Sequence, residues 1–475
     1  MSLKVYNVLT GKKEDFVPRE EGKVKMYACG ITVSDNAHIG HAYQAIIFDM
    51  IRSYLEYIGN EVTYVRNYTD VDDKIIINAR KAGINPKDFA EAYIKKTDAE
   101  LDALNIKRPT IQARATENID EMIEFISKLI EKGYAYATEA GDVYYRVNAF
   151  SDYGKFSNRS VDEQFVGVRK EVEAGKEDDR DFALWKNAGD DEIYWESPWG
   201  KGRPGWHIEC SAMSMKYLGE TLDIHGGGKD LKFPHHENEI AQSEALTGKQ
   251  FANYWIHNGL VKVNGQKMSK SLGNGILIED LIKKYNPDTV KMTILQNNYR
   301  SDLNIMDGMF EQVEEKIYNI YKLFTQIDSL GEGLNSNKDT EIYKTIDTEF
   351  RDAMDNDFNT SVVISNIFGY INTMNKLIDK KDIQALVDMK YAIKKIYKTF
   401  GLLQQEPDKV ISEIKNKYLT AYNITVDEIE SAINLRNEYK INKNYEGADQ
   451  IRNELLEKGI TIKDSREGTS WDIKF

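Results

Sequence analysis

The stretch that decides the fold is VKMYACG (24–30), followed after a short loop by HIGHAYQAIIFDMIRSYLEYIGN (38–60) and EVTYVRNY (61–68). The first and third segments have the apolar patterns of strands. Between them, apolar residues recur at helical spacing up to Gly59, where we expect the helix to end. A strand, a helix and a strand within about 45 residues form a βαβ unit. Such a unit predicts a parallel sheet with a ligand site at the carboxyl ends of its strands.

Composition describes a long chain with packed cores. The chain has 475 residues, of which 41% are hydrophobic and 11% aromatic, so we expect several domains. The sequence has no run of about 18 apolar residues and no secretory signal, so we expect a cytoplasmic protein without membrane contact. The net charge of -14 argues against nucleic acid bound over the whole surface, although a local site is compatible with it. We also expect a monomer.

The pattern along the chain predicts an α/β fold: a Rossmann-like parallel-sheet catalytic domain with an insertion, followed by a helical bundle and a small C-terminal domain. The insertion is inferred from a polar, charged stretch at about 150–200, and the bundle from three apolar stripes at helical spacing after residue 307. The expected units are 1–110 (first half of the catalytic domain), 111–200 (insertion), 201–258 (second half), 259–306 (loop region), 307–405 (bundle) and 406–475 (C-terminal domain).

Three shorter segments give local expectations. LDIH (222–225) predicts the end of a strand, Gly226–Gly228 a tight turn, and HHENEIAQSEALTG (235–248) a helix closed by its final glycine. In LVKVNGQK (260–267), an Asn-Gly pair after an alternating run predicts a hairpin turn.

His38-Ile39-Gly40-His41 lies where the first strand passes into the first helix. A helix N-terminus offers unpaired N–H groups and partial positive charge, so imidazoles there can add hydrogen-bond donors to a bound phosphate, and Gly40 permits close approach. We therefore expect His38 and His41 to act in catalysis on a phosphate compound. The alternative is a pair of surface histidines that cap a helix.

Lys267-Met268-Ser269-Lys270-Ser271 follows the predicted hairpin. Lysines on a loop can close over a triphosphate and neutralise the charge that develops as pyrophosphate leaves, so we expect Lys267 and Lys270 to take part in catalysis. Taken alone, such a loop is equally often solvated surface.

A metal site is predicted from two sulfurs, an imidazole and a carboxylate that are scattered along the chain: Cys29, Cys210, His235 and Glu239. His235 and Glu239 are four residues apart on one helix, so their side chains can reach the same point. Such a donor set suits zinc, although both cysteines could also be ordinary core residues. His236 and Glu237 are rival ligands, and we expect them to point away because successive helical residues are rotated by about 100°.

These motifs occur in an order that resembles the class I aminoacyl-tRNA synthetases. More specifically, the chain resembles the cysteinyl-tRNA synthetases over almost its whole length. The segments that carry the resemblance are YACGITVSDNAHIGHA, YVRNYTDVDDKI, DFALWK, GRPGWHIECSAM, DIHGGGKDLKFPHHENEIAQSEA, KMSKSLGN, DFNT (357–360) and NYEGADQIRNELLEKGI.

The resemblance implies roles for individual residues. Cys29, Cys210, His235 and Glu239 would hold zinc. The ATP site would comprise Ile31, His38, Gly40, His41 and Lys270, with Mg²⁺ accompanying the nucleotide. The cysteine substrate would lie near Thr69, Trp206, His225 and Asp230, although Trp206 and His225 could equally be packing residues.

The implied reaction is attack of the cysteine carboxylate on the α-phosphate of ATP, followed by transfer from cysteinyl-adenylate to the terminal ribose of the tRNA for cysteine. Zinc would select cysteine over serine because it binds a thiolate far better than a hydroxyl, with Glu239 as the weakest ligand. Residues 406–475 would bind the anticodon. Two alternatives are a cysteine ligase of thiol biosynthesis with an amino-sugar acceptor, and a non-catalytic zinc- or RNA-binding paralogue.

Overall fold

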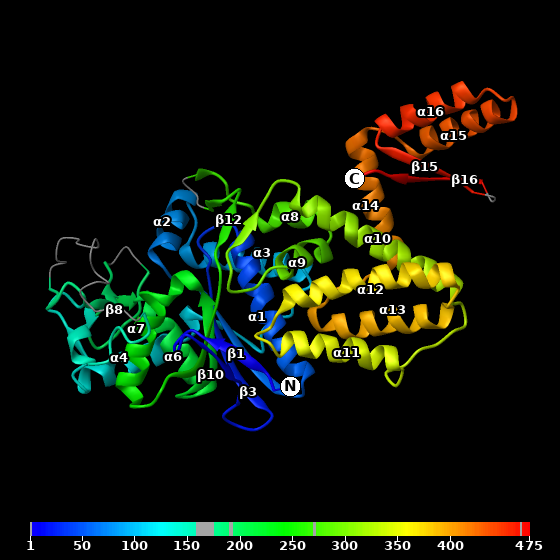
Figure 1. Ribbon diagram of the computed structural model, residues 1–475. Coiled ribbons are helices and arrows are strands. Elements are labelled where there is room, and N and C mark those ends of the chain that lie inside the picture. The colour runs from blue at the N-terminus through cyan, green and yellow to red at the C-terminus, as the bar shows by residue number, and fades with distance from the viewer. Residues whose placement is uncertain (1, 158–174, 190–192, 269–271, 466–467) are drawn as a thin grey trace.

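The computed structural model describes residues 2–157, 175–189, 193–268, 272–465 and 468–475. Its centre is a parallel sheet in the order β11-β10-β3-β4-β5 (Figure 1). The strands are β3 (Lys23–Thr32), β4 (Glu61–Thr69), β5 (Ile111–Arg114), β10 (Leu222–Gly228) and β11 (Ala252–Asn258). This topology confirms the Rossmann-like fold, in which segments on both sides of the insertion complete one sheet.

Alternation along β3 assigns side chains to the two faces of the sheet. Met26 and Ala28 pack in the same core as helix α1 (Ile39–Tyr57), whereas Tyr27 and Cys29 pack in the core on the opposite face. That second core contains residues of α4 (Ile119–Glu131), α6 (Trp206–Leu218) and α7 (His235–Thr247). The face that receives Cys29 is therefore the face covered by α6 and α7.

The glycine run after LDIH is strand and not turn, so that expectation was wrong. β10 continues to Gly228 because Gly226, Gly227 and Gly228 each pair with a residue of β11. A Cβ atom on Gly226 would lie 2.2 Å from the carbonyl oxygen of Ile256. Glycine here serves close backbone approach within the sheet rather than reversal of the chain.

Other expected elements are confirmed. α7 ends at Gly248, which has a left-handed conformation. β12 (Val261–Val263) and β13 (Gln266–Lys267) form a hairpin with positive φ at Asn264 and Gly265. β12 also pairs in parallel with β14 (Leu303–Ile305), and α8 (Ile278–Lys284) and α9 (Pro287–Leu295) lie between them in sequence.

The region between β4 and α6 begins with two helices, α2 (Asp73–Ala82) and α3 (Pro86–Ala103). An antiparallel sheet in the order β6-β7-β8-β9 follows, with its first three strands inside the expected insertion (111–200) and β9 just beyond it. Its strands are β6 (Ala135–Ala137), β7 (Val143–Tyr145), β8 (Phe182–Asn187) and β9 (Gly202–Pro204).

The chain after residue 307 is mainly helical, as expected. The bundle comprises α10 (Met309–Leu330), α11 (Glu341–Met354), α12 (Thr360–Lys380) and α13 (Ile383–Tyr397). The predicted stripes face its core: Ile317, Ile367 and Ile393 are fully buried. The N-terminal strands β1 (Lys4–Asn7) and β2 (Lys12–Asp15) form a separate hairpin.

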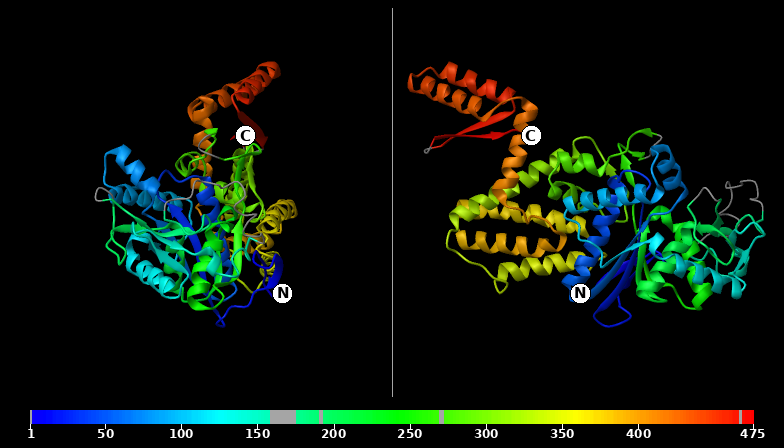
Figure 2. Two further views of the ribbon diagram at one scale, coloured as in Figure 1. Left: turned by 90° about the vertical axis from the view of Figure 1, so that its left-hand side faces the viewer. Right: turned by 180° about the vertical axis from the view of Figure 1, so that it is seen from behind.

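A small C-terminal unit stands apart from the rest of the molecule. α14 (Pro407–Tyr422) leads outward to a helical hairpin and a strand pair, and all views show this unit projecting from the body (Figures 1 and 2). Its elements are α15 (Val426–Ile441), α16 (Tyr445–Glu457), β15 (Ile460–Ser465) and β16 (Gly468–Ile473). Among the described residues, no helix is both long enough and apolar enough to cross a bilayer.

Candidate active site

The four predicted metal ligands converge at the carboxyl end of β3. Cys29 comes from β3, Cys210 from α6, and His235 and Glu239 from the first turns of α7. All four side chains are buried, and one donor atom from each lies within 4.8 Å of the others. The His235 Nε2 atom is 3.0 Å from Glu239 Oε1, as their spacing of four residues requires.

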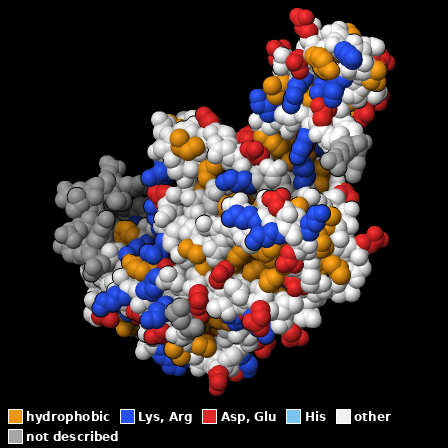
Figure 3. Space-filling model, turned by 45° about the vertical axis from the view of Figure 1, so that its right-hand side comes forward, with side chains coloured by type: hydrophobic (Ala, Val, Ile, Leu, Met, Phe, Trp, Pro, Cys, Tyr) orange, Lys and Arg blue, Asp and Glu red, His pale blue; other side chains and the backbone are white. Residues whose placement is uncertain are grey.

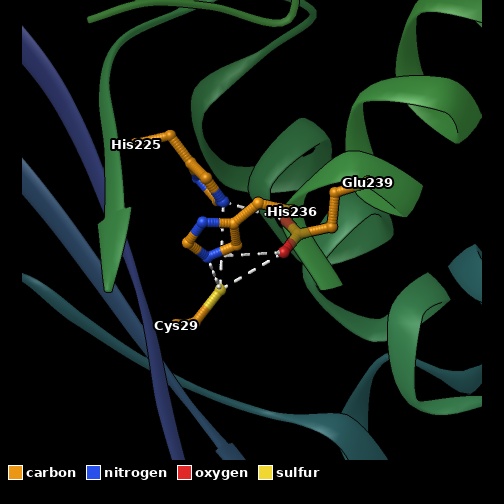
Figure 4. Close-up of side chains that lie close together, drawn as sticks. All are labelled: Cys29, His225, His236 and Glu239. Atoms are coloured by element: carbon orange, nitrogen blue, oxygen red, sulfur yellow. Dashed lines mark hydrogen bonds and ion pairs between the residues drawn. The ribbon is translucent and has the colours of Figure 1, made fainter. Parts of the chain in front are cut away.

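A second group of possible ligands shares two members with the first. Cys29 and Glu239 also lie within 4.8 Å of donor atoms from His225 and His236 (Figure 4). The Cys29 Sγ atom is 3.3 Å from His236 Nε2, and His225 Nε2 is 2.9 Å from Glu239 Oε2. Two overlapping sets of four donors therefore surround one buried space.

The expectation that His236 points away from the cluster was wrong. The cluster lies between β3, β10 and the start of α7, so residues on two adjacent faces of the helix can reach it. His236 is held from its other side by His257, whose Nε2 lies 2.7 Å from His236 Nδ1. Glu237 does point elsewhere and accepts hydrogen bonds from the backbone N–H groups of Gly154 and Ser157.

Five of the chain's seven histidines lie in or beside this cluster. We did not expect this grouping from the sequence. Besides His225, His235 and His236 they include His257 at the end of β11 and His207, whose Nδ1 lies 2.9 Å from His235 Nδ1. The available signal was the concentration of histidines between residues 207 and 257. Only the sheet register, which places His257 beside Gly227 of β10, shows that they meet.

Several ionisable groups of the cluster have pKa values far from their usual ones. Burial and the neighbouring Cys210 raise the pKa of Cys29 well above its usual value. Burial would also raise the pKa of Cys210, but hydrogen bonds from Cys29 and His235 lower it to about 6. Burial opposes charge on His235 as well, yet Glu239 and Cys210 raise its pKa to about 10. The protein thus places a protonated imidazole between a buried thiolate and a buried carboxylate.

The donors present fit a soft divalent cation. His225 Nδ1 is buried and has no hydrogen-bond partner within the described part of the chain. A cation would compensate the thiolate and the carboxylate, and sulfur with imidazole nitrogen is a donor set typical of zinc. Asn67 supports the sulfur side, since its Oδ1 accepts from Gly30 N at 2.7 Å and lies 3.7 Å from Cys210 Sγ.

A cavity of about 540 Å³ adjoins the cluster at the same edge of the sheet. Its lining includes Ile31, His38, Gly40, His41, Trp206, Asp230, Lys267 and Met268. Lys270 lies outside the described residues. The cavity therefore brings together both predicted phosphate motifs, as far as the structure describes them.

The two histidines of the first motif are ordered by the helix that they begin. His38 is the N-cap of α1, its Nδ1 accepts from Gly40 N, and His41 Nδ1 accepts from His38 N. The two rings stack with centroids 3.8 Å apart. A Cβ atom on Gly40 would lie 2.9 Å from the His38 ring, so a larger residue here would displace that ring.

The four residues expected near the amino acid divide into two groups. Trp206 and Asp230 line the cavity, and the Trp206 ring also stacks on His235 at 4.3 Å, so it bridges cavity and cluster. His225 belongs to the buried cluster itself. Thr69 is buried nearby but does not line the cavity, and its hydroxyl donates to Glu209 at 2.6 Å.

Comparison with known proteins identifies the family. A model of the tRNA synthetases class I (C) catalytic domain matches residues 15–315, and a DALR domain model matches residues 349–404. The cysteine–tRNA ligase of Geobacter sulfurreducens is 46% identical over 482 residues, covering 100% of both chains. The chain belongs to the cysteine–tRNA ligase family. The cysteine–tRNA ligase of Thermodesulfovibrio yellowstonii is likewise 46% identical, over 99% of this chain and 100% of that protein.

Solved structures agree with this cysteine–tRNA ligase fold. Methionyl-tRNA synthetase of Mycobacterium tuberculosis, in complex with methionyl-adenylate, superposes with a TM-score of 0.60 at 14% identity, covering 82% of this chain and 93% of that one. A leucyl synthetase in a ternary complex from Agrobacterium radiobacter gives 0.59 at 10% identity, covering 84% and 88%. At these identities the likeness shows the fold only.

Proposed function

We propose that this aminoacyl-tRNA synthetase activates cysteine with ATP and transfers it to the tRNA for cysteine. The observation that carries the proposal is the junction at Trp206, where a buried cluster rich in sulfur and imidazole meets a cavity lined by His38, His41 and Lys267. A thiol-selective centre beside a phosphate-binding cavity is the arrangement that cysteine activation needs.

Zinc is the metal that these donors fit best, with Cys29, Cys210, His235 and Glu239 as its ligands. When bound, it would hold the substrate thiol as a thiolate and so discriminate against serine. Glu239 is the ligand whose position can vary, because its carboxylate is also within reach of His225. Trp206 covers the cluster from the cavity side and leaves 42% of its own surface exposed, so it can contact the side chain of a bound amino acid.

The cavity would take ATP, together with Mg²⁺. His38 and His41, at the positive end of α1, would stabilise phosphate oxygens, and Ile31 and Gly40 would pack against the nucleotide. Lys267 and Lys270 would neutralise the leaving pyrophosphate. His225, Asp230 and Thr69 would position the amino acid. No protein nucleophile is required, since the cysteine carboxylate itself attacks the α-phosphate.

The test is cysteine-dependent exchange of pyrophosphate into ATP by zinc-loaded protein. We expect exchange with cysteine and little with serine. Strong exchange with serine would contradict selection by the metal, and no exchange with cysteine would contradict the activity itself. Exchange without tRNA charging, combined with transfer to an amino sugar, would indicate a ligase of thiol biosynthesis.

The C-terminal unit would bind the anticodon of the tRNA. It carries lysine and arginine side chains among acidic ones (Figure 3), and residues 435–475 hold eight basic and eight acidic residues in a chain whose net charge is -14. Removal of residues 406–475 should weaken tRNA charging and spare pyrophosphate exchange. Equal charging by the truncated protein would refute this role. We also propose that the chain has the six units given above, is a monomer and is located in the cytoplasm.

A further inference from the structure

The turn between α11 and α12 has an unusual backbone. Asp357 and Phe358 are consecutive non-glycine residues with φ of 65° and 51°. Left-handed conformations are unfavourable for such residues, so contacts must hold them in place. Both side chains are buried, and Phe358 packs edge-to-face against Tyr54 of α1. The turn is therefore fixed against the helix whose first turn carries His38 and His41.

The Asp357 carboxylate binds two segments that are distant in sequence. Its Oδ1 accepts from the backbone N–H of Tyr6 and from the Tyr299 hydroxyl, each at 2.8 Å. Its Oδ2 accepts from Arg300 Nε at 3.0 Å. A buried carboxylate with these partners fixes the position of the segment 299–302, which connects α9 to β14.

The segment 299–302 in turn contacts both sides of the nucleotide cavity. The Tyr43 hydroxyl of α1 lies 2.8 Å from the Tyr299 carbonyl oxygen and 2.9 Å from that of Ser301. On the other side, Gly259 N donates to the same Tyr299 oxygen at 2.8 Å, and Leu260 N donates to Asp302 Oδ1 at 3.0 Å.

These contacts reach the groups assigned to phosphate chemistry. Gly259 and Leu260 directly precede β12, the first strand of the hairpin that ends in Lys267. Tyr43, Gly259 and Leu260 line the cavity together with His41 and Lys267. The segment 299–302 therefore holds the His38–His41 motif and the hairpin that ends in Lys267 at a fixed distance from each other.

We propose that Asp357 is a positioning residue for amino-acid activation, acting through Tyr299 to hold the segment 299–302 between α1 and the β12–β13 hairpin. The inference rests on the proposed function. Asp357 does not line the cavity, so its effect is on the geometry of the phosphate-binding groups and not on substrate contact.

Tyr299→Phe removes only the hydroxyl that joins Tyr299 to Asp357. We expect the kcat of cysteine-dependent pyrophosphate exchange to fall by about tenfold, with the KM for cysteine unchanged. Displacement of the segment 299–302 would move the phosphate-binding groups and so weaken stabilisation of the transition state. Tyr397→Phe is the matched control, since that buried hydroxyl donates to the Val363 carbonyl oxygen within the bundle. Equal kcat values in the two variants would overturn the proposal.

Asp357→Asn provides a second variant, because asparagine tolerates positive φ and retains an acceptor for Tyr299 while losing the charge that faces Arg300. We expect a smaller loss of kcat than for Tyr299→Phe, together with a lower thermal midpoint because the hydrogen bond from Arg300 Nε to the carboxylate is lost. A fall in the thermal midpoint with unchanged kcat would assign Asp357 a purely structural role and overturn the proposal.

The double variant Tyr43→Phe/Tyr299→Phe tests whether both hydroxyls act on one segment. If both hydroxyls hold the same segment, the effects of the two substitutions on activity do not add, so the double variant should lose little more activity than the worse single variant. Losses that multiply would contradict a shared segment. If the unaltered protein gives no exchange, the proposed function fails instead, so the two failures are distinguishable.

Discussion

Cys29 reaches the buried cluster of possible metal ligands because of its position in the alternating pattern of β3. Tyr27 and Cys29 face α6 and α7, whereas Met26 and Ala28 face α1, so a shift of one residue would bury the thiol in the wrong core. The alternation of VKMYACG predicts these two sets. Which set faces which helices depends on where the later helices pack, and the sequence pattern does not contain that information.

The adjacent histidines of α7 should respond differently to substitution. If His235 is a zinc ligand and His236 only supports the site, His235→Gln should abolish stoichiometric zinc binding, and His236→Gln should retain zinc with about 10- to 100-fold lower affinity. Zinc content and competition with a chelator would measure both. The reverse order would assign the ion to the second donor set, which contains His225 and His236.

Metal affinity should rise with pH. In the metal-free protein, Cys29 has a raised pKa and His235 a pKa of about 10, so both hold protons at neutral pH, whereas Cys210, with a pKa of about 6, does not. Binding must displace the protons of Cys29 and His235, so roughly two protons should be released per zinc ion and the affinity should increase between pH 6 and pH 8. Calorimetry in buffers of different ionisation enthalpy would measure this release, and a pH-independent affinity would contradict it.

At the scale of elements, the central sheet depends on an irregularity between β3 and β4. The register shifts between Ala28 and Ile31, which brings the Gly30 backbone against β4. The sequence predicts both strands but gives no sign of this bulge. It also fails to indicate β5, because an edge strand of four residues carries too little periodicity. We did not expect α2 either, although its buried residues Ile75, Ile76 and Ala79 have helical spacing.

Gly30→Ala should disrupt this part of the sheet. A Cβ atom at Gly30 would lie 1.6 Å from the Asn67 carbonyl oxygen, so the backbone must move, and we expect a loss of at least about 3 kcal/mol in the free energy of unfolding. Gly369→Ala is the control, because this position in α12 has open space around it and should gain about 0.5–1 kcal/mol. Chemical denaturation would compare the two variants, and equal stabilities would contradict the prediction.

At the scale of the whole molecule, a buried ammonium group contributes to the contact between the catalytic unit and the bundle. Lys291 of α9 donates to the carbonyl oxygens of Asn105, after α3, and of Phe400, after α13. Burial lowers its pKa despite the nearby Asp49 and Asp288. The sequence predicts a helical bundle from its stripes, but a lysine within α9 resembles any surface lysine until the two units are seen together.

Lys291→Ala should weaken this contact between the catalytic unit and the bundle. The buried carbonyl oxygen of Phe400 and the partly buried one of Asn105 would lose their donor and a cavity would remain, so we expect about 3 kcal/mol of destabilisation and a lower thermal midpoint. Lys409→Ala, at an exposed site on α14, should change stability by less than about 0.5 kcal/mol. Equal thermal midpoints for Lys291→Ala and Lys409→Ala would show that Lys291 does not stabilise the contact between the catalytic unit and the bundle.

The contact between β1 and the turn after α11 has a consequence for synthesis of the chain. Tyr6 N and Asp357 Oδ1 are separated by 351 positions in sequence. At about 5–20 residues per second, the ribosome needs on the order of tens of seconds between making one partner and making the other. During that interval the backbone donors of the β1–β2 hairpin lack their final acceptor, so chaperones that shield emerging strands have a defined period in which to act on this protein.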